Sequence, residues 1–295
     1  MDKLELKALG KINLGLDILG RRENGYHDVR MVMQTVYLYD RVILEKTREP
    51  GIEISTNLPY LPVNENNIAY KAAELLQREF GIREGIRISL EKHIPVAAGM
   101  AGGSSNAAAV LFGMNRMFDL GLSEEGLKER GVTLGADVPY CIMRGTVLAE
   151  GIGEKLNQLP PLPDCYVLIG KPGVSVSTKM AYENLKLDQI KRHPDIDGMI
   201  RDIQKGDLYS MTEKMENVFE PGIIERYPVI RKIKDFMKEK GALGAMMSGS
   251  GPTVFGIFDD MEKIHAAAEA LKKTGLAKTV FAARIYNRNG GTKDE

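Results

Sequence analysis

The chain has 295 residues, 43% of them hydrophobic and 27% charged, which is typical of a folded protein with one large core or two ordinary ones. Its 40 basic and 40 acidic side chains cancel, so no overall field attracts it to nucleic acid or to an anionic membrane. Cys141 and Cys165 are too few for a disulfide framework and lack metal-ligand spacing. No apolar run is long enough to span a bilayer. The two cysteines suit a reducing cytoplasm, and the balanced charge means that any bound anion must be held by local groups.

The first half of the chain alternates strand-like and helix-like patterns. Asn66 and Asn67 can cap a helix that runs to Phe80, and Gly81 can end it. Alternating apolar residues and β-branched residues predict strands before and after this helix. The predicted strands cover residues 4–9, 12–19, 29–45 and 86–90.

A Leu-Pro-Pro-Leu-Pro segment at residues 159–163 interrupts these patterns. Proline removes backbone donors and fixes φ, which suits a connection between domains. We therefore predict an N-terminal domain of residues 1–157 and a C-terminal domain of residues 158–295.

The second half begins with a predicted strand at residues 166–170 and ends with strands in 244–257 and 279–286 that flank a helix at 261–273. This strand-helix-strand order predicts an α+β fold class. Further helical patterns lie at residues 177–185, 196–205, 208–219 and 222–240.

A glycine-rich segment at residues 95–109 follows the predicted strand 86–90 and leads into a helical pattern. Small residues let backbone amides approach an anion, and a helix N-terminus adds unpaired N–H groups, so phosphate is the expected guest. We expect Ser104 and Ser105 to be good N-caps, and either hydroxyl could reach a phosphate oxygen or magnesium. A flexible turn before a capped helix is the alternative. The segment contains neither a Walker P-loop nor Gly-x-Gly-x-x-Gly.

Two polar pairs near the N-terminus are candidates for substrate binding. Lys11 and Asn13 share one face of an extended segment, because side chains alternate along a strand. Tyr26 and His27 offer a ring to stack on a nucleobase and a polar edge to hydrogen-bond it. An edge-strand lysine and a surface-turn histidine remain the alternatives.

Asp137 lies in a Gly-Ala-Asp-Val-Pro stretch that follows a helix beginning at Ser123. A carboxylate near an ammonium group stays ionised and can accept a proton from a hydroxyl, while the ammonium stabilises the developing alkoxide. This division of labour fits Asp137 and Lys11. A surface or capping aspartate is the alternative.

Three motifs resemble, in order, those of the GHMP kinase superfamily, at residues 8–16, 95–107 and 246–255. The Gly-Tyr-His stretch ending at His27 is similar to the cytidine-binding element of one branch, the diphosphocytidyl-methylerythritol kinases. The resemblance implies a two-domain fold with an N-terminal ribosomal protein S5 domain 2-like part and a C-terminal ferredoxin-like α/β sandwich. The active site would lie in the cleft between them.

The same resemblance implies roles for individual residues. Lys11 and Asp137 would be catalytic, and of the two serine hydroxyls considered above, Ser105 is the candidate magnesium contact. The acceptor would be bound by Asn13, Tyr26, His27, Thr178 and Tyr182. ATP would be bound by Pro95, Val96, Ala97, Ala98, Gly99, Met100, Ala101, Gly102, Gly103, Ser104, Ser105 and Asn106, with Asn67 and Lys92.

The implied reaction is ATP- and Mg²⁺-dependent phosphorylation of the 2-hydroxyl of 4-diphosphocytidyl-2-C-methyl-D-erythritol, a step of the non-mevalonate isoprenoid pathway. The expected ligands are therefore ATP and a cytidine diphosphate-linked polyol. Another GHMP kinase, acting on homoserine, mevalonate or a sugar, is the alternative, as is a non-catalytic nucleotide-binding relative. Tyr26 and His27 favour the cytidyl acceptor, and the retained Lys11 and Asp137 favour catalysis.

Overall fold

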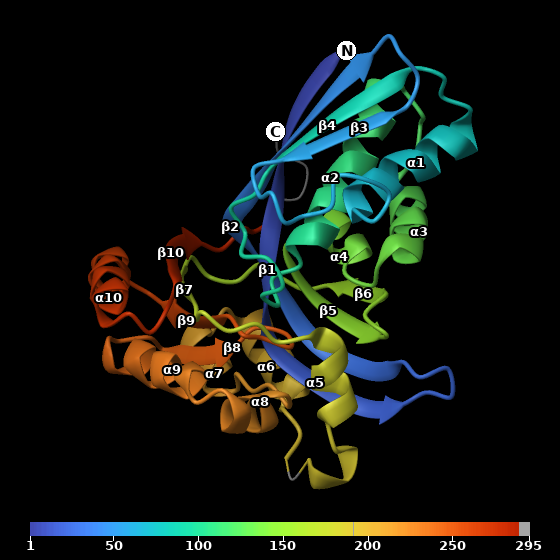
Figure 1. The fold of residues 1–295 in the computed structure, drawn as a ribbon. Coiled ribbons are helices and arrows are strands. Elements are labelled where there is room, and N and C mark those ends of the chain that lie inside the picture. Colours follow the sequence, from blue (N-terminus) through green and yellow to red (C-terminus); the bar gives the residue numbers. More distant parts are fainter. Residues whose placement is uncertain (191, 289–295) are drawn as a thin grey trace.

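Two long antiparallel strands, β1 (Lys3–Arg21) and β2 (His27–Thr47), run through the computed structural model, which describes residues 1–190 and 192–288 (Figure 1). They pair along most of their length, with register shifts at Leu9/Gly10, Asn13/Gly15 and Ile18/Gly20. The strands predicted at residues 4–9 and 12–19 are therefore one strand. Its irregularities bend the ladder without ending it.

These two strands belong to the first sheet, whose order is β3-β4-β2-β5-β6 with β1 paired to β2. β3 pairs parallel with β4, and this short strand was not predicted from the sequence. Helices α1 to α4 lie on one side of the sheet (Figure 1). The remaining strands are β3 (Ile52–Thr56), β4 (Gly85–Glu91), β5 (Thr146–Gly151) and β6 (Lys155–Gln158), and the helices are α1 (Ile68–Phe80), α2 (Gly102–Met117), α3 (Glu124–Leu134) and α4 (Val138–Met143).

The helix caps confirm one prediction and correct another. Asn67 caps α1 by accepting a hydrogen bond from the Ala69 amide at 3.0 Å, and Gly81 ends the helix in the left-handed conformation. The N-cap of α2 is Ala101, with φ of 55°. Because this residue turns the chain before Gly102, Ser104 and Ser105 lie inside the first turn and are not caps.

The second sheet has the order β10-β7-β9-β8, with all neighbours antiparallel. The predicted strand-helix-strand unit is confirmed as β9, α10 and β10. All strands of the first sheet precede residues 159–163 and all strands of the second follow them, while the domain division itself stays a prediction. The elements are β7 (Tyr166–Lys171), β8 (Gly244–Met247), β9 (Val254–Phe258), α10 (Met261–Thr274) and β10 (Thr279–Arg284).

Two predicted helices of the second half are shorter in the structure. The pattern at residues 208–219 is helical only to Glu213, and the pattern at 222–240 divides at Tyr227 and Pro228. Proline has no N–H to continue a helix and fits its first turn, so a new helix starts there. The helices are α5 (Thr178–Asn184), α6 (Ile196–Lys205), α7 (Leu208–Glu213), α8 (Glu220–Arg226) and α9 (Val229–Glu239), with a 3₁₀ turn at Leu187–Gln189.

Alternate residues of the second sheet enter different parts of the core. Leu168 packs in the cluster that includes α9 and α10, whereas Val167 and Ile169 pack with α6, α7 and the long strands. Because side chains alternate along a strand, the second sheet is buried on both of its faces. The shared core holds the second sheet against β1 and β2. In the described ranges 1–190 and 192–288, no helix has the length and apolar character needed to cross a bilayer.

Candidate active site

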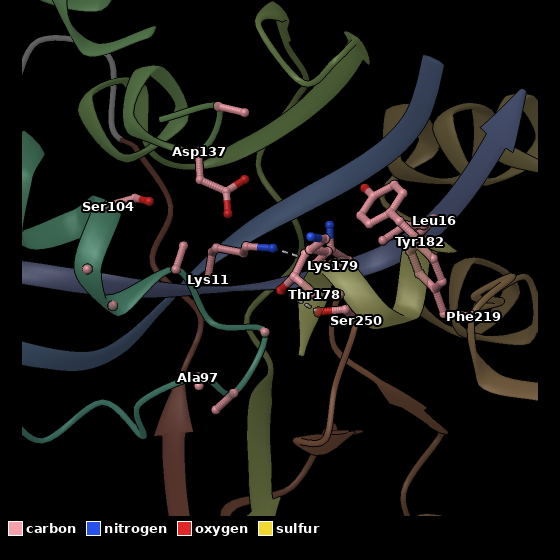
Figure 2. A pocket seen from close by; sticks show the side chains of 18 of the residues that line it. Lys11, Leu16, Ala97, Ser104, Asp137, Thr178, Lys179, Tyr182, Phe219 and Ser250 are labelled. Carbon is pink, nitrogen blue, oxygen red and sulfur yellow. Dashed lines mark hydrogen bonds between the residues drawn. The ribbon is translucent and has the colours of Figure 1, made fainter. Parts of the chain in front are cut away.

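A cavity of about 1330 Å³ opens where β1, the glycine-rich loop, α5 and the loop after β8 meet (Figure 2). Residues of both halves of the chain line it, which matches the expected cleft. The predicted site residues that line it are Lys11, Asn13, Tyr26, His27, Asn67, Lys92, Pro95, Val96, Ala97, Ala98, Gly99, Ala101, Gly102, Gly103, Ser104, Asn106, Asp137, Thr178 and Tyr182.

Lys11 and Asn13 contact each other on the cavity face of β1, as their spacing predicts. The Lys11 ammonium donates to Asn13 Oδ1 at 2.7 Å, and both residues are buried. The Lys11 amide donates to the Met100 carbonyl at 3.1 Å, which joins β1 to the glycine-rich loop. The ammonium group is therefore held beside this loop.

Asp137 occupies the turn before α4, and its carboxylate points into the cavity that Lys11 also faces (Figure 2). Burial raises the pKa of the Cys141 thiol, and the Asp137 charge raises it further, whereas the Lys11 charge lowers it. The charges of Asp137 and Lys11 thus both reach this thiol. Within residues 1–190 and 192–288, the Asp137 carboxylate has no hydrogen-bond or ion-pair partner. An acceptor hydroxyl can occupy the space before it.

The glycine-rich loop curves through three left-handed residues, Ala97, Gly99 and Ala101, with φ of 50°, 73° and 55°. Most of the loop faces the cavity, as predicted. Met100 instead packs in the core, and Ser105 is buried with its hydroxyl donating to the Leu9 carbonyl at 2.7 Å. The structure therefore does not bring these two residues to the site. Ser104 faces the cavity in place of Ser105 and is the better candidate for a magnesium contact.

The loop of residues 248–251 packs directly on the glycine-rich loop. Ser248 Oγ donates to the Gly99 carbonyl at 2.9 Å. A Cβ on Gly99 would lie 2.0 Å from the Ser248 carbonyl oxygen, so the approach requires glycine. The third motif, which alone fits a plain hairpin turn, is thus part of the site wall.

Asn217 supports this second loop and was not found from the sequence. Its side-chain amide donates to the carbonyls of Met247 and Gly249, each at 2.8 Å, and its oxygen accepts from the Phe219 amide. No local motif marks Asn217, because the two carbonyls it bonds lie 30 and 32 residues away in the sequence.

Asn67 and Lys92 line the cavity, but their side chains are already engaged. Asn67 caps α1 and donates to the Pro62 carbonyl at 2.9 Å. The Lys92 ammonium forms a buried ion pair with Asp40 and donates to Asn106 Oδ1 at 2.7 Å. Burial lowers the pKa of Lys92, and the Asp40 charge opposes that shift.

An aromatic cluster forms another part of the cavity wall. The rings of His27 and Tyr182 lie 5.1 Å apart at 43°, and Phe219 packs edge-on against Tyr182 at 4.8 Å. Burial and the Arg21 charge lower the pKa of His27, whereas burial raises that of Tyr182 to about 12. Tyr26 is 58% exposed at the rim. Phe219, at the end of a broken helical pattern, was not predicted as a site residue.

Thr178, the first residue of α5, lines the cavity. The Thr178 hydroxyl lies 3.0 Å from that of Ser250, which links α5 to the second loop. In the described part of the chain, no three or more His, Cys, Asp or Glu side chains gather as metal ligands would.

Known families and proteins match the chain over most of its length. The model for the GHMP kinase N-terminal domain matches residues 67–145, and that for the GHMP kinase C-terminal domain matches residues 199–277. A 4-diphosphocytidyl-2-C-methyl-D-erythritol kinase of Lachnospira eligens is 56% identical, over 97% of this chain and 99% of that protein. The chain belongs to the GHMP kinases, in this branch. A second such kinase, from Lachnoclostridium phytofermentans, is 54% identical over 97% of this chain and 98% of its own length.

Solved structures agree with the GHMP kinase fold. A crystal structure of 4-(cytidine 5'-diphospho)-2C-methyl-D-erythritol kinase superimposes with a TM-score of 0.82 at 31% identity, covering 96% of this chain and 99% of that one. A Cytophaga hutchinsonii homoserine kinase, at 22% identity, has a TM-score of 0.76 over 97% of this chain and 94% of its own, and shows the fold alone. The predicted two-domain α+β fold is confirmed, and the chain is an ATP-dependent kinase of small molecules.

Proposed function

We propose that this GHMP kinase transfers the γ-phosphate of ATP to the 2-hydroxyl of 4-diphosphocytidyl-2-C-methyl-D-erythritol, in the non-mevalonate isoprenoid pathway. This proposal rests chiefly on one cavity, whose wall contains both the glycine-rich loop and the aromatic cluster. Lys11 and Asp137 point into the same cavity. Its volume of about 1330 Å³ exceeds the roughly 300–1,000 Å³ of ordinary ligand pockets, which suits two nucleotide-sized ligands.

The phosphate end of ATP is assigned to the loop 95–104. Its left-handed residues curve the backbone, and the start of α2 adds the positive end of a helix. Lys11 lies beside this loop and can neutralise charge on the transferred phosphoryl group.

Asp137 is assigned as the base that takes the proton from the acceptor hydroxyl. Its carboxylate is without a partner in the described ranges and faces the same space as Lys11. The Lys11 charge favours the alkoxide that develops on the acceptor when its proton is removed. The two side chains thus act on one oxygen atom.

Magnesium fits this site as an ion held chiefly by the nucleotide. Mg²⁺ commonly keeps several waters and takes only one or two protein oxygens together with phosphates. The Ser104 hydroxyl offers such an oxygen at the cavity wall, and no three-residue acidic cluster lies among the described residues. When bound, the ion neutralises charge shared between the β- and γ-phosphates.

The cytosine base is assigned to the aromatic cluster. His27 and Tyr182 provide ring faces and polar edges, and Tyr26 stands at the rim where it can cover the base. Homoserine and mevalonate offer no base to stack, so this cluster favours a cytidyl acceptor. The shared cavity of Lys11 and Asp137 favours a working enzyme over a non-catalytic relative.

We also place the enzyme in the cytoplasm. Cys141 and Cys165 are free, buried thiols, as a reducing compartment allows, and the small-molecule substrates are soluble metabolites.

An acceptor panel tests the proposed function. Purified protein, ATP and Mg²⁺ are offered 4-diphosphocytidyl-2-C-methyl-D-erythritol, mevalonate or homoserine in parallel, and ADP release is measured. We expect turnover with the cytidyl acceptor alone. Strong turnover with mevalonate or homoserine would overturn the assignment, and ADP release from none of them would favour the non-catalytic alternative.

A further inference from the structure

Asp40, on β2, is fully buried and accepts four hydrogen bonds. Its Oδ1 accepts from the amides of His93 and Ile94 at 2.7 and 2.8 Å. Its Oδ2 accepts from Asn106 Nδ2 at 2.9 Å and from the Lys92 ammonium in an ion pair. Every lone-pair direction of the carboxylate is thus engaged.

The four partners stand at the two ends of the phosphate loop. Residues 92–94 immediately precede Pro95, and Asn106 lies in the first turns of α2, just after the loop. Lys92 also donates to Asn106 Oδ1 at 2.7 Å, which joins the two ends directly. One side chain from a neighbouring strand therefore closes the loop at its base.

The loop between these ends is strained. Ala97 and Ala101 adopt left-handed backbone conformations with φ of 50° and 55°. These conformations are unfavourable for residues that have a Cβ atom. Such conformations persist only where surrounding structure holds them. The loop therefore needs fixed ends to keep the curvature that faces the phosphates.

We propose that Asp40 is a positioning residue that holds the phosphate loop in its ATP-binding conformation by joining its two ends. The proposal rests on the proposed function in that ATP is the loop's ligand. Lys92 and Asn106, implied as ATP contacts by resemblance, act here through Asp40.

Only a carboxylate serves at this position. All four partners are donors, so an asparagine would turn its own N–H₂ toward two of them. It would also leave the Lys92 ammonium, 4% exposed, without its counter-charge.

The test compares Asp40→Asn with the control Asp202→Asn. Asp202 also forms an ion pair, with Lys214, but neither residue lines the cavity. Hydrogen exchange of the amides in residues 95–104 is measured without nucleotide or acceptor, followed by titration with ATP. We expect Asp40→Asn alone to speed loop exchange and to weaken ATP binding by about tenfold or more, the lower end of what an unpaired buried partner costs.

A second variant keeps the test decisive if Asp40→Asn does not fold. Asn106→Ala leaves the Lys92–Asp40 pair intact and frees only the α2 end, so its loop exchange should also rise above that of Asp202→Asn. Unchanged loop exchange in the variant that folds, or an equal rise in Asp202→Asn, would overturn the proposal. Because exchange is read without ligands, failure of the proposed acceptor leaves this outcome unaffected.

Discussion

Lys11 and Asp137 come from elements far apart in the chain and reach one cavity. Lys11 is buried on β1 with its ammonium on Asn13, whereas Asp137 sits in the turn before α4 with its carboxylate free of partners in the described ranges. One group is thus fixed and the other is open to a substrate proton. This asymmetry is what a supporting cation and a base require.

Asp137→Asn keeps the side-chain shape but removes its charge and its ability to accept a proton. We expect ATP binding to survive and kcat to fall about 100- to 10,000-fold, the usual value of general-base assistance. Steady-state kinetics and ATP titration check this. Near-normal kcat across the pH range would show that positioning alone drives the transfer.

Lys11→Met should also reduce kcat, because the developing alkoxide loses its cation. If Lys11 and Asp137 act on the same hydroxyl, the double variant should be little worse than either single variant. Multiplied losses in the double variant would instead mean that the two residues act independently.

His27→Ala should lower kcat/KM for the cytidyl acceptor by about ten- to hundredfold and leave the ATP KM unchanged, because a buried polar edge loses its partner. A normal acceptor KM would make His27 a turn residue only.

Acidification should act on the same side chain. Burial and Arg21 lower the pKa of His27 from 6.5, so the folded pocket favours neutral imidazole. The contribution of neutral His27 to folding stability is fully present above pH 6.5 and is lost as the pH falls through the lowered pKa of His27. We expect the acceptor KM to rise over that interval in the wild type. The rise should be absent in His27→Ala, and equal pH profiles would contradict this role.

Among the elements, two glycine loops form one wall of the cavity by direct contact. The approach of Ser248 to Gly99 leaves no room for a methyl group, whereas a Cβ on Gly103 would meet only Ile68, at 3.6 Å. The two glycines therefore differ in their surroundings. Gly99 lets the loops pack, whereas Gly103 lines the cavity with little protein close to it.

Gly99→Ala and Gly103→Val test this difference. We expect Gly99→Ala to lower the melting temperature, because its Cβ would clash with the Ser248 carbonyl and its φ is 73°. Gly103→Val should fold and bind ATP weakly. Calorimetric titration of ATP, after a melting curve for each variant, is the measurement. Unchanged ATP affinity in folded Gly103→Val would remove this residue from the site.

At the scale of the whole molecule, β1 connects the phosphate side with the second half of the chain. Near its middle, Lys11 bonds the glycine-rich loop. Farther along, Leu16 exchanges backbone hydrogen bonds with Glu216 and Val218, at 3.0 and 3.1 Å. Asn217, between those partners, holds the loop after β8 and the amide of Phe219. One segment thus supports both the loop after β8 and the aromatic cluster.

Asn217→Ala should therefore disturb both ligand sites. It leaves two carbonyls and one amide without their partner, at about 1–3 kcal/mol for each buried group left unpaired. We expect a lower melting temperature and raised KM for both substrates. Asn115→Ala is the matched control, since Asn115 bridges the Leu122 backbone through two hydrogen bonds outside the cavity. KM values that stay normal in Asn217→Ala would limit Asn217 to a stabilising role.

Local patterns were sufficient for much of this protein. The caps of α1, the strand β4 and helix α6, the shared face of Lys11 and Asn13, and the order of the three motifs follow from the sequence, because periodicity and capping act within a few residues. Resemblance then gave the kinase family.

Other features depended on contacts between distant segments. The backbone turn at Ala101 decided that Ser104 faces the cavity and that Ser105 bonds Leu9, 96 residues away. The roles of Asp40, Asn217 and Phe219 likewise depend on contacts with distant residues, which no local pattern specifies. Residue identity and short-range patterns thus specify which chemical groups are present and which short elements carry them. Which groups meet depends on the folded chain, because side-chain direction at a loop or helix start is set by packing against the rest of the chain.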